Sequence, residues 1–282
     1  KISAELAVGQ AITIKEPMLL DQWLIWLEQR PSEGGRITSL IRPWDSPELP
    51  AQELTPPSAN LRNRIHTYGG GLLSAAISNN ILLIVWSEDS TGALWTQSFK
   101  FLDYKKYHLS YWVEPLSQPI CLSNGVQAAF GDGLIDISKE RWIGVMEKDG
   151  QDFLVAFSLD KENQTPITLH APLDFAGYAV LSPDANQIAW IEWGKLHMPW
   201  DSSQLWWGKI NKFGDIESKT LIAGSGFNQR KDISVFQPFW FSDSQLVVAE
   251  DSDGFWNLIM TKDYIKTNCL PKWDKICSLE VE

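Results

Sequence analysis

Apolar and polar positions alternate in short runs along most of this chain, and clusters of turn-forming residues separate the runs. This period of two is typical of β-strands with one buried face. Five runs rich in Ile, Val, Leu and Trp stand out: Trp23–Glu28, Ile81–Trp86, Trp142–Glu147, Ile188–Trp193 and Leu246–Ala249. Their starts step by roughly 50–60 residues, the scale of one four-stranded propeller blade with its loops.

Turn signals fall where a repeat of strand, turn and strand requires them. Three clusters follow a predicted second strand and precede a predicted third strand (Leu94–Phe99, Phe153–Leu159 and Phe255–Met260): Asp89–Gly92, Lys148–Gly150 and Asp251–Gly254. Asp-Gly and related pairs permit the positive φ angles of tight hairpins. Two further clusters, Ser182–Asn186 and Ser242–Ser244, mark the turn one strand earlier.

The pattern predicts an all-β fold, a β-propeller of four-stranded antiparallel blades. We count about five blade-like units, the first and last incomplete, which favours part of a larger ring over a closed five-blade ring. The Pro-rich and acidic segment Pro43–Ser58 is interpreted as an excursion between blades, and the polar segment Ser225–Asp232 as a loop.

Composition narrows the classes of partner. The chain has 282 residues, 44% of them hydrophobic, and a formal net charge of −11. A charge of this sign argues against nucleic acid and against anionic membrane surfaces, because both need clustered Lys and Arg. No apolar run approaches the roughly 20 residues that span a bilayer. The chain begins at Lys1 without a signal-peptide core, so we expect a processed protein or a piece of a longer gene product.

Cysteines and candidate catalytic motifs point to no chemistry in this chain. Cys121, Cys269 and Cys277 match no zinc spacing and are interpreted as reduced thiols of a cytoplasmic protein. Gly224-Ser-Gly226 lacks the spacing of a nucleophile elbow. Asp251–Gly254 lacks the flanking ligands of a calcium loop and is a hairpin turn. We therefore expect no catalytic residue, metal or cofactor here.

Two segments carry candidate binding residues. In the first, Arg62, Arg64, His66 and Tyr68 alternate before a triple glycine, and an extended segment would place them on one face. They either bond neighbouring loops and carboxylates, or form a cationic patch facing a cavity, able to hold a peptide carboxylate or carbonyl groups.

The second segment contains Glu192, Trp193, Trp200 and Asp201. These residues either form an aromatic and acidic wall of a pocket, or Trp193 and Trp200 plug a blade junction while Asp201 caps a turn. The fifteen tryptophans of the chain are interpreted chiefly as packing between sheets.

Five ordered segments resemble the N-terminal propeller of prolyl oligopeptidase family serine peptidases, in the acylaminoacyl-peptidase or dipeptidyl-aminopeptidase-like branch. They cover roughly residues 3 to 262 and are Trp26–Arg36, Arg62–Gly71, Leu181–Asp201, Val235–Trp240 and Asp251–Leu258. Two positions depart from the family pattern. Thr67 replaces a Glu, which puts an acidic role there in doubt, and Ala185 replaces a turn Gly.

The resemblance implies that residues 1–282 are the propeller of a larger serine peptidase whose C-terminal α/β-hydrolase domain, holding Ser, Asp and His, lies outside this chain. The propeller would be catalytically inert, and would cap the active site and restrict it to short peptides. Its partners would be that hydrolase domain and the peptide substrates.

Two other functions stay open at this point. One is a free-standing scaffold propeller that binds proteins, and the other is a carbohydrate-binding propeller that uses exposed Trp. An incomplete ring leaves unpaired blade edges, so we also expect self-association.

Overall fold

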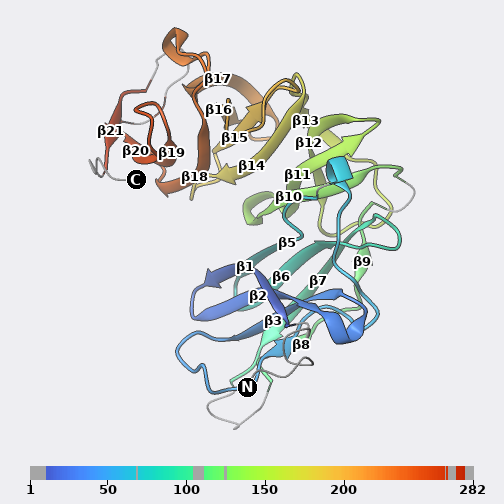
Figure 1. Ribbon diagram of the computed structural model, residues 1–282. Helices are drawn as coiled ribbons and strands as arrows, with labels where there is room; N and C mark the ends of the chain where they lie inside the picture. Colours follow the sequence, from blue (N-terminus) through green and yellow to red (C-terminus); the bar gives the residue numbers. More distant parts are fainter. Residues whose placement is uncertain are drawn as a thin grey trace, which may run out of the picture. The chain divides into compact units, whose positions relative to one another are not determined.

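The computed structural model describes residues 11–67, 69–103, 111–123, 126–263, 265 and 271–276. The described chain forms five antiparallel sheets and four short 3-10 turns (Figure 1). It divides into two compact units, one of residues 1–131 with 161–164 and one of residues 132–160 with 165–282. Among the described residues, no helix has the length and apolar character that crossing a bilayer requires.

The first unit contains two sheets. The first has the order β1 (Thr13–Leu20), β2 (Trp23–Arg30), β3 (Arg36–Pro43) and β4 (Gln52–Glu53), with the 3-10 turn η1 (Pro31–Glu33) between β2 and β3. The second has the order β5 (Leu73–Ser78), β6 (Ile81–Ser87), β7 (Leu94–Phe101) and β8 (Val113–Pro115), and β9 (Ile120–Cys121) also pairs with β7. The turn η2 (Ile65–Thr67) precedes β5.

The second unit contains three sheets, and its boundary falls within β10. The first sheet comprises β10 (Ala129–Asp136), β11 (Arg141–Lys148), β12 (Gln151–Ser158) and β13 (Ile167–His170), with η3 (Ile137–Lys139). The second comprises β14 (Phe175–Leu181), β15 (Gln187–Trp193), β16 (Gln204–Ile210) and β17 (Ile216–Gly224). The third comprises β18 (Val235–Ser242), β19 (Gln245–Glu250), β20 (Asn257–Thr261) and β21 (Trp273–Lys275), preceded by η4 (Phe227–Gln229).

This architecture confirms the predicted class, an all-β propeller built of four-stranded antiparallel blades. The expectation that the first and last units are incomplete is wrong, because each of these sheets has four strands. Each predicted second strand lies within the second strand of a sheet, namely β2, β6, β11, β15 and β19. The predicted third strands correspond to β7, β12 and β20, with ends that differ by up to two residues. The prediction of strands rested on apolar residues at every second position, since alternate side chains of a strand point to opposite faces.

The interpretation of Pro43–Ser58 as an excursion between blades is wrong for part of the segment. Gln52 and Glu53 form β4, the fourth strand of the first sheet, with Glu53 paired to Leu40 and Gln52 to Ile41. A strand of two residues leaves no apolar periodicity for a sequence pattern to detect. The loop predicted at Ser225–Asp232 is confirmed, with η4 inside it.

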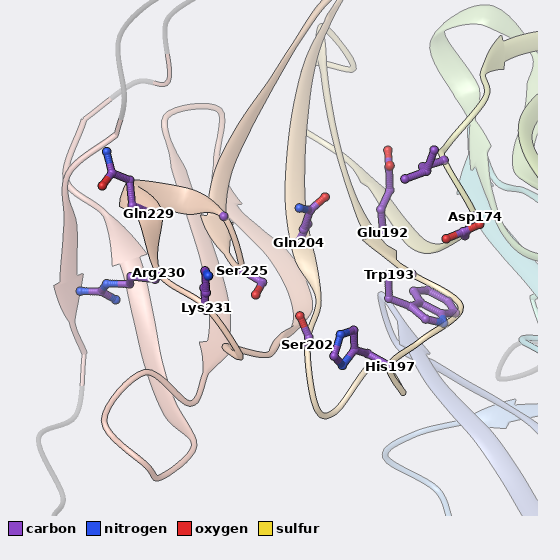
Figure 2. A pocket seen from close by; sticks show the side chains of 13 residues that line it. Asp174, Glu192, Trp193, His197, Ser202, Gln204, Ser225, Gln229, Arg230 and Lys231 are labelled. Carbon is purple, nitrogen blue, oxygen red and sulfur yellow. The ribbon is translucent and has the colours of Figure 1, made fainter.

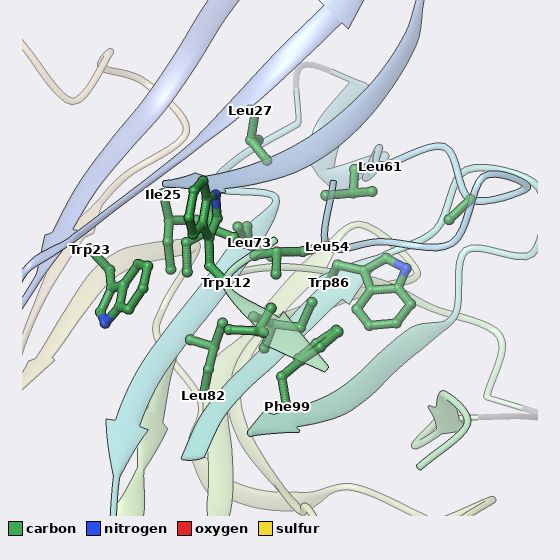
Figure 3. Packing of buried hydrophobic residues seen from close by; sticks show 14 of the residues in the cluster. Trp23, Ile25, Leu27, Leu54, Leu61, Leu73, Leu82, Trp86, Phe99 and Trp112 are labelled. Carbon is green, nitrogen blue, oxygen red and sulfur yellow. The ribbon is translucent and has the colours of Figure 1, made fainter. Parts of the chain in front are cut away.

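A continuous apolar core joins the two sheets of the first unit (Figure 3). Trp23, Ile25 and Leu27 on β2 face one way and are all buried, as the alternation predicts. The Trp23 ring stacks on Phe101 with the ring centroids 4.7 Å apart. Burial of such side chains stabilises a fold by about 1.5–3 kcal/mol each, so this face of the first blade is fixed by its contact with the second.

Tryptophan supplies much of the core volume. Eight of the fifteen tryptophans belong to the buried hydrophobic set: Trp23, Trp26, Trp86, Trp112, Trp142, Trp190, Trp207 and Trp240. Trp44, Trp200 and Trp256 are exposed. The prediction that packing between sheets explains most of the tryptophan content is therefore confirmed.

The sheets β14–β17 and β18–β21 pack face to face through a second apolar cluster. The β14–β17 sheet contributes Ala189, Ile191, Leu205 and Trp207, whose side chains share one face by their cross-strand pairing. Alternate residues of β19, including Leu246 and Val248, meet them from the other side and are fully buried.

The opposite face of the last sheet is apolar, and no other described sheet of the second unit packs on it. Phe239 pairs with Val247, Val247 with Met260, and Leu258 with Ala249, so these five side chains share one face. Phe239 is 61% exposed and Leu258 is 47% exposed. They occupy the positions that Val180, Ala189, Trp207, Leu205 and Ile191 hold in the preceding sheet, where the next sheet covers them.

Candidate functional site

The candidate residues of each segment gather at one end of their sheets. In an antiparallel sheet, the first strand begins where the second strand ends. Arg62 and Arg64 precede β5, and Asp89 follows β6. In the β14–β17 sheet, Glu192 and Trp193 end β15 at the edge where β14 and β16 begin and β17 ends. Loops at this end of a blade are therefore where ligand contacts would be made.

Arg62 and Arg64 share one acidic partner. The side chain of Arg64 is 70% exposed, and its Nη2 lies 3.4 Å from Asp89 Oδ1. Arg62 Nη1 lies 4.0 Å from Asp89 Oδ2. Both guanidinium groups thus lie beside one carboxylate while most of each side chain stays in solvent. The predicted bond to a neighbouring carboxylate is thus present, and a cationic patch facing a cavity stays a prediction.

The predicted alternation holds through Arg64 and then ends. Leu61, Asn63 and Ile65 are buried while Arg62 and Arg64 are exposed. At η2 the backbone turns, because His66 adopts the left-handed conformation with a φ of 47°. A side chain in a turn does not continue the face of an extended segment, so His66 departs from the predicted common face. Tyr68 lies outside the described residues.

Glu192 is held in a buried hydrogen-bond network. Its Oε1 accepts from Trp190 Nε1 at 2.7 Å and lies 2.7 Å from His170 Nε2. Lys219 Nζ lies 3.2 Å from His170 Nδ1. An ammonium group only donates, so His170 Nδ1 is the acceptor and the ring proton sits on Nε2, from which it is donated to Glu192. Two hydrogen-bond donors therefore fix the position of the carboxylate.

The other three candidate residues of the second segment differ in burial and in the contacts they make. Trp193 is half-buried, tilts against Phe175 with ring centroids 5.7 Å apart, and packs on the second apolar cluster. Trp200 is 57% exposed, so the interpretation that it plugs a blade junction is wrong. Asp201 accepts from the Met198 backbone N–H through Oδ2 at 3.3 Å, which is the predicted turn cap.

Glu192 and Trp193 line a hollow of about 430 Å³ in the second unit (Figure 2). Its wall comes from the residues before β14, the end of β15, the start of β16 and the loop that contains η4. The remaining lining residues are Leu173, Asp174, Gly194, His197, Ser202, Gln204, Ser225, Gly226, Gln229, Arg230 and Lys231. Trp200 and Asp201 are not part of this lining.

The hollow is lined by polar and charged side chains that can bind a ligand, but these side chains lack the hydrogen bonds of a nucleophilic triad. Ser202, His197 and Asp174 all line it, but no hydrogen bond joins their side chains. Asp174 instead pairs with Lys195 at 3.6 Å. A triad needs a base bonded to the nucleophile and oriented by a third group. Among the described residues, no three His, Cys, Asp or Glu side chains gather as a metal ion would require.

Sequence reasoning missed several residues of this wall. Asp174, Lys231 and the network partners His170 and Lys219 were not singled out. Their signal is topological, because only the order of strands in the sheets reveals which residues come together. The segment Ser225–Asp232 was recognised as a polar loop, but nothing in its residues indicated that it faces Glu192.

The segment Trp26–Arg36, which carries part of the resemblance, forms an ion-pair network on the first sheet. Arg30 bonds Glu28, Glu33 and Glu53, and Arg36 bonds Glu33 and Glu53. The distances to Glu53 are 2.7 and 2.8 Å. β4 supplies Glu53, so the motif ties the short fourth strand to the hairpin of β2 and β3. This role is structural.

Sheets of this order and packing define the class of β-propeller proteins. No family model and no curated protein matches the sequence. Solved structures do match. A puromycin hydrolase is similar with a TM-score of 0.77 and 21% identity over 99% of this chain and 41% of that chain. A puromycin-hydrolyzing peptidase of Mycobacterium tuberculosis is similar with a TM-score of 0.73 and 19% identity, over 95% and 39%.

A third match is prolyl oligopeptidase B from Galerina marginata, with a TM-score of 0.55 and 10% identity over 95% of this chain and 37% of that chain. The resemblance expected from the ordered segments is thus confirmed in the fold. The chain spans about two-fifths of the length of the structures it matches. Identities this low establish the fold, and the function needs a separate argument.

Proposed function

We propose that this chain is the non-catalytic propeller of a prolyl oligopeptidase type serine peptidase, where it gates the active site for short peptides. The observation that carries the proposal is the match of 99% of the chain to only 41% of a puromycin hydrolase. The hydrolase domain of the same polypeptide would supply the nucleophile, the base and the oxyanion hole. The propeller would exclude folded proteins by size.

The loop end of the blades supports this role. Exposed cations at Arg62 and Arg64, and the hollow beside Trp193, lie on loops at the same end of their own sheets. If the hydrolase domain packs over these loops, a peptide in its active site would meet polar groups that can bind its carboxylate and carbonyl groups. The reduced-thiol interpretation of the cysteines supports a cytoplasmic setting.

The uncovered face of the last sheet supports a longer polypeptide. Phe239, Val247, Ala249, Leu258 and Met260 repeat the face through which the preceding sheet binds its neighbour. A further blade would bury this face in the same way. Contiguous apolar surface of this kind marks an interaction site.

The carbohydrate-binding alternative has less support. The three exposed tryptophans, Trp44, Trp200 and Trp256, do not line the hollow beside Trp193 or the two hollows near Phe227 and Pro183.

The test is made on the protein in its native source. A lysate is treated with a serine-directed phosphonate probe, and the polypeptide is captured with an antibody raised against this chain. We expect a labelled species well over twice the 31.9 kDa of this chain. An unlabelled species at the mass of this chain would overturn the proposal and favour a free-standing scaffold propeller.

A further inference from the structure

The hollow beside Trp193 is polarised. Figure 2 shows Asp174, Glu192 and Trp193 on one side and Gln229, Arg230 and Lys231 on the other. The polar side chains of Ser202, Gln204 and Ser225 lie between the two sides. A ligand spanning the hollow therefore meets an acidic and aromatic wall at one end and a basic wall at the other.

The acidic wall has one preorganised acceptor. Both hydrogen bonds to Glu192 fall on Oε1, and Oε2 accepts none from the described residues. Asp174 is already paired with Lys195 and accepts the Lys195 backbone N–H at 3.1 Å. Glu192 is 8% exposed, and its bonds to Trp190 and His170 fix the orientation of the carboxylate. A positioned carboxylate next to an indole ring suits an ammonium group.

The basic wall has one available cation. Arg230 pairs with Glu250, Nη1 to Oε2 at 3.6 Å. Lys231 is exposed and has no hydrogen bond or ion pair with another described residue. Its ammonium is therefore the group that a carboxylate entering the hollow would meet.

We infer that this hollow binds a short zwitterionic peptide, with the terminal ammonium at Glu192 Oε2 and the terminal carboxylate at Lys231. The inference rests on the proposed function only in taking peptides as the ligand class. A volume of about 430 Å³ suits a ligand of a few residues. Opposite charges on facing walls disfavour a simple anion or a neutral sugar, since neither satisfies both walls.

The experiment measures binding to this chain by calorimetry and needs no catalytic domain. The probes are the tripeptide Ala-Leu-Ala, its N-acetylated form and its C-terminal amide. We expect each blocked form to bind about tenfold to a hundredfold more weakly than the free peptide, the range for losing a charged hydrogen bond. Equal affinity for the free and both blocked peptides, or binding of none of them, would overturn the inference.

Two variants assign the ends. Glu192→Gln keeps the Oε1 acceptor for Trp190 and His170 but replaces Oε2 by an amide that repels an ammonium. It should lose the preference for the free amine and keep the preference for the free carboxylate. Lys231→Met, at an exposed site, should show the reverse pattern.

Matched controls lie on the same unit away from the hollow. Glu217→Gln and Lys212→Met change charge at exposed positions of β17 and of the turn before it, and should leave all three affinities unchanged. If the control variants changed the peptide affinities as strongly as the wall variants, net charge and not a specific contact would determine binding. That result would also overturn the assignment. The phosphonate test is independent, so each proposal can fail alone.

Discussion

Single residues of the first sheet show how burial and ion pairing compete. Burial by itself raises the pKa of Glu53, but hydrogen bonds from Arg36, Thr38 and Arg30 outweigh it and hold that pKa below its ordinary value. A depressed carboxylate pKa contributes stability above the unfolded pKa of about 4.3. That contribution is lost as pH falls through the folded pKa.

Replacing Glu53 should therefore matter at neutral pH and not in acid. We expect Glu53→Gln to lower the free energy of unfolding by about 1 kcal/mol at pH 7, a modest value because the pairs are screened by solvent. Urea unfolding at pH 7 and at about pH 3 measures the difference, which should shrink in acid. An equal loss at both pH values would contradict the ionic explanation. Glu114→Gln, in an exposed pair with Lys100, is the control.

Arg64 tests the cationic patch in the full-length protein. If its guanidinium holds a peptide carboxylate or carbonyl, Arg64→Ala should lower kcat/KM for short peptides by about tenfold. Lys100→Ala, which also removes an exposed cation from the first unit, should leave kcat/KM unchanged. Unchanged kcat/KM for all peptides in Arg64→Ala would leave Arg64 with only its structural bond to Asp89.

At the scale of elements, strands were predictable and their close packing was not. Alternation located β2, β6, β11, β15 and β19, because an apolar residue at every second position directly reflects a buried face. The strand β4 was not predicted, because two residues are too few to show an alternating pattern. The glycines of β10 and β11 also gave no signal, although they make room for a ring.

Trp142 is 1% exposed and lies against Gly133 and Gly144. A Cβ at Gly144 would lie 2.3 Å from the Trp142 ring. Gly144→Ala should therefore destabilise the second unit by about 3 kcal/mol, the upper range for overpacking a core. Denaturant unfolding followed by tryptophan fluorescence measures this loss.

Gly194→Ala is the matched control for that substitution. Its added Cβ would meet Asp174 at 3.5 Å, an ordinary contact, and its φ is not positive. It should leave the unfolding midpoint nearly unchanged. Similar losses in the two variants would show that glycine itself, and not the Trp142 contact, sets the stability.

At the scale of the whole molecule, the uncovered face of β18–β21 predicts self-association of this chain by itself. The expectation from sequence placed self-association at open strand edges. The exposed Phe239 and Leu258 make the sheet face the stronger candidate, because burying apolar area drives association. Sedimentation equilibrium should show concentration-dependent dimers.

The double variant Phe239→Ser with Leu258→Ser should weaken that association by at least about tenfold. Phe213→Ser removes a ring that is 78% exposed in the β16–β17 turn, and it should not change the association. A monomer at all concentrations, or dimers insensitive to the double variant, would contradict a role for this face.

The strand period, the turns and the spacing of the units can be deduced from the sequence, because each depends on residues that are neighbours along the chain. The order of motifs also carried the resemblance that the fold then confirmed. The contacts between side chains, in contrast, become known only from the folded chain. Glu192 and Lys231 line one hollow, and Arg30 and Arg36 converge on Glu53, because sheet pairing joins residues far apart in sequence. Such contacts leave no periodic trace in one chain.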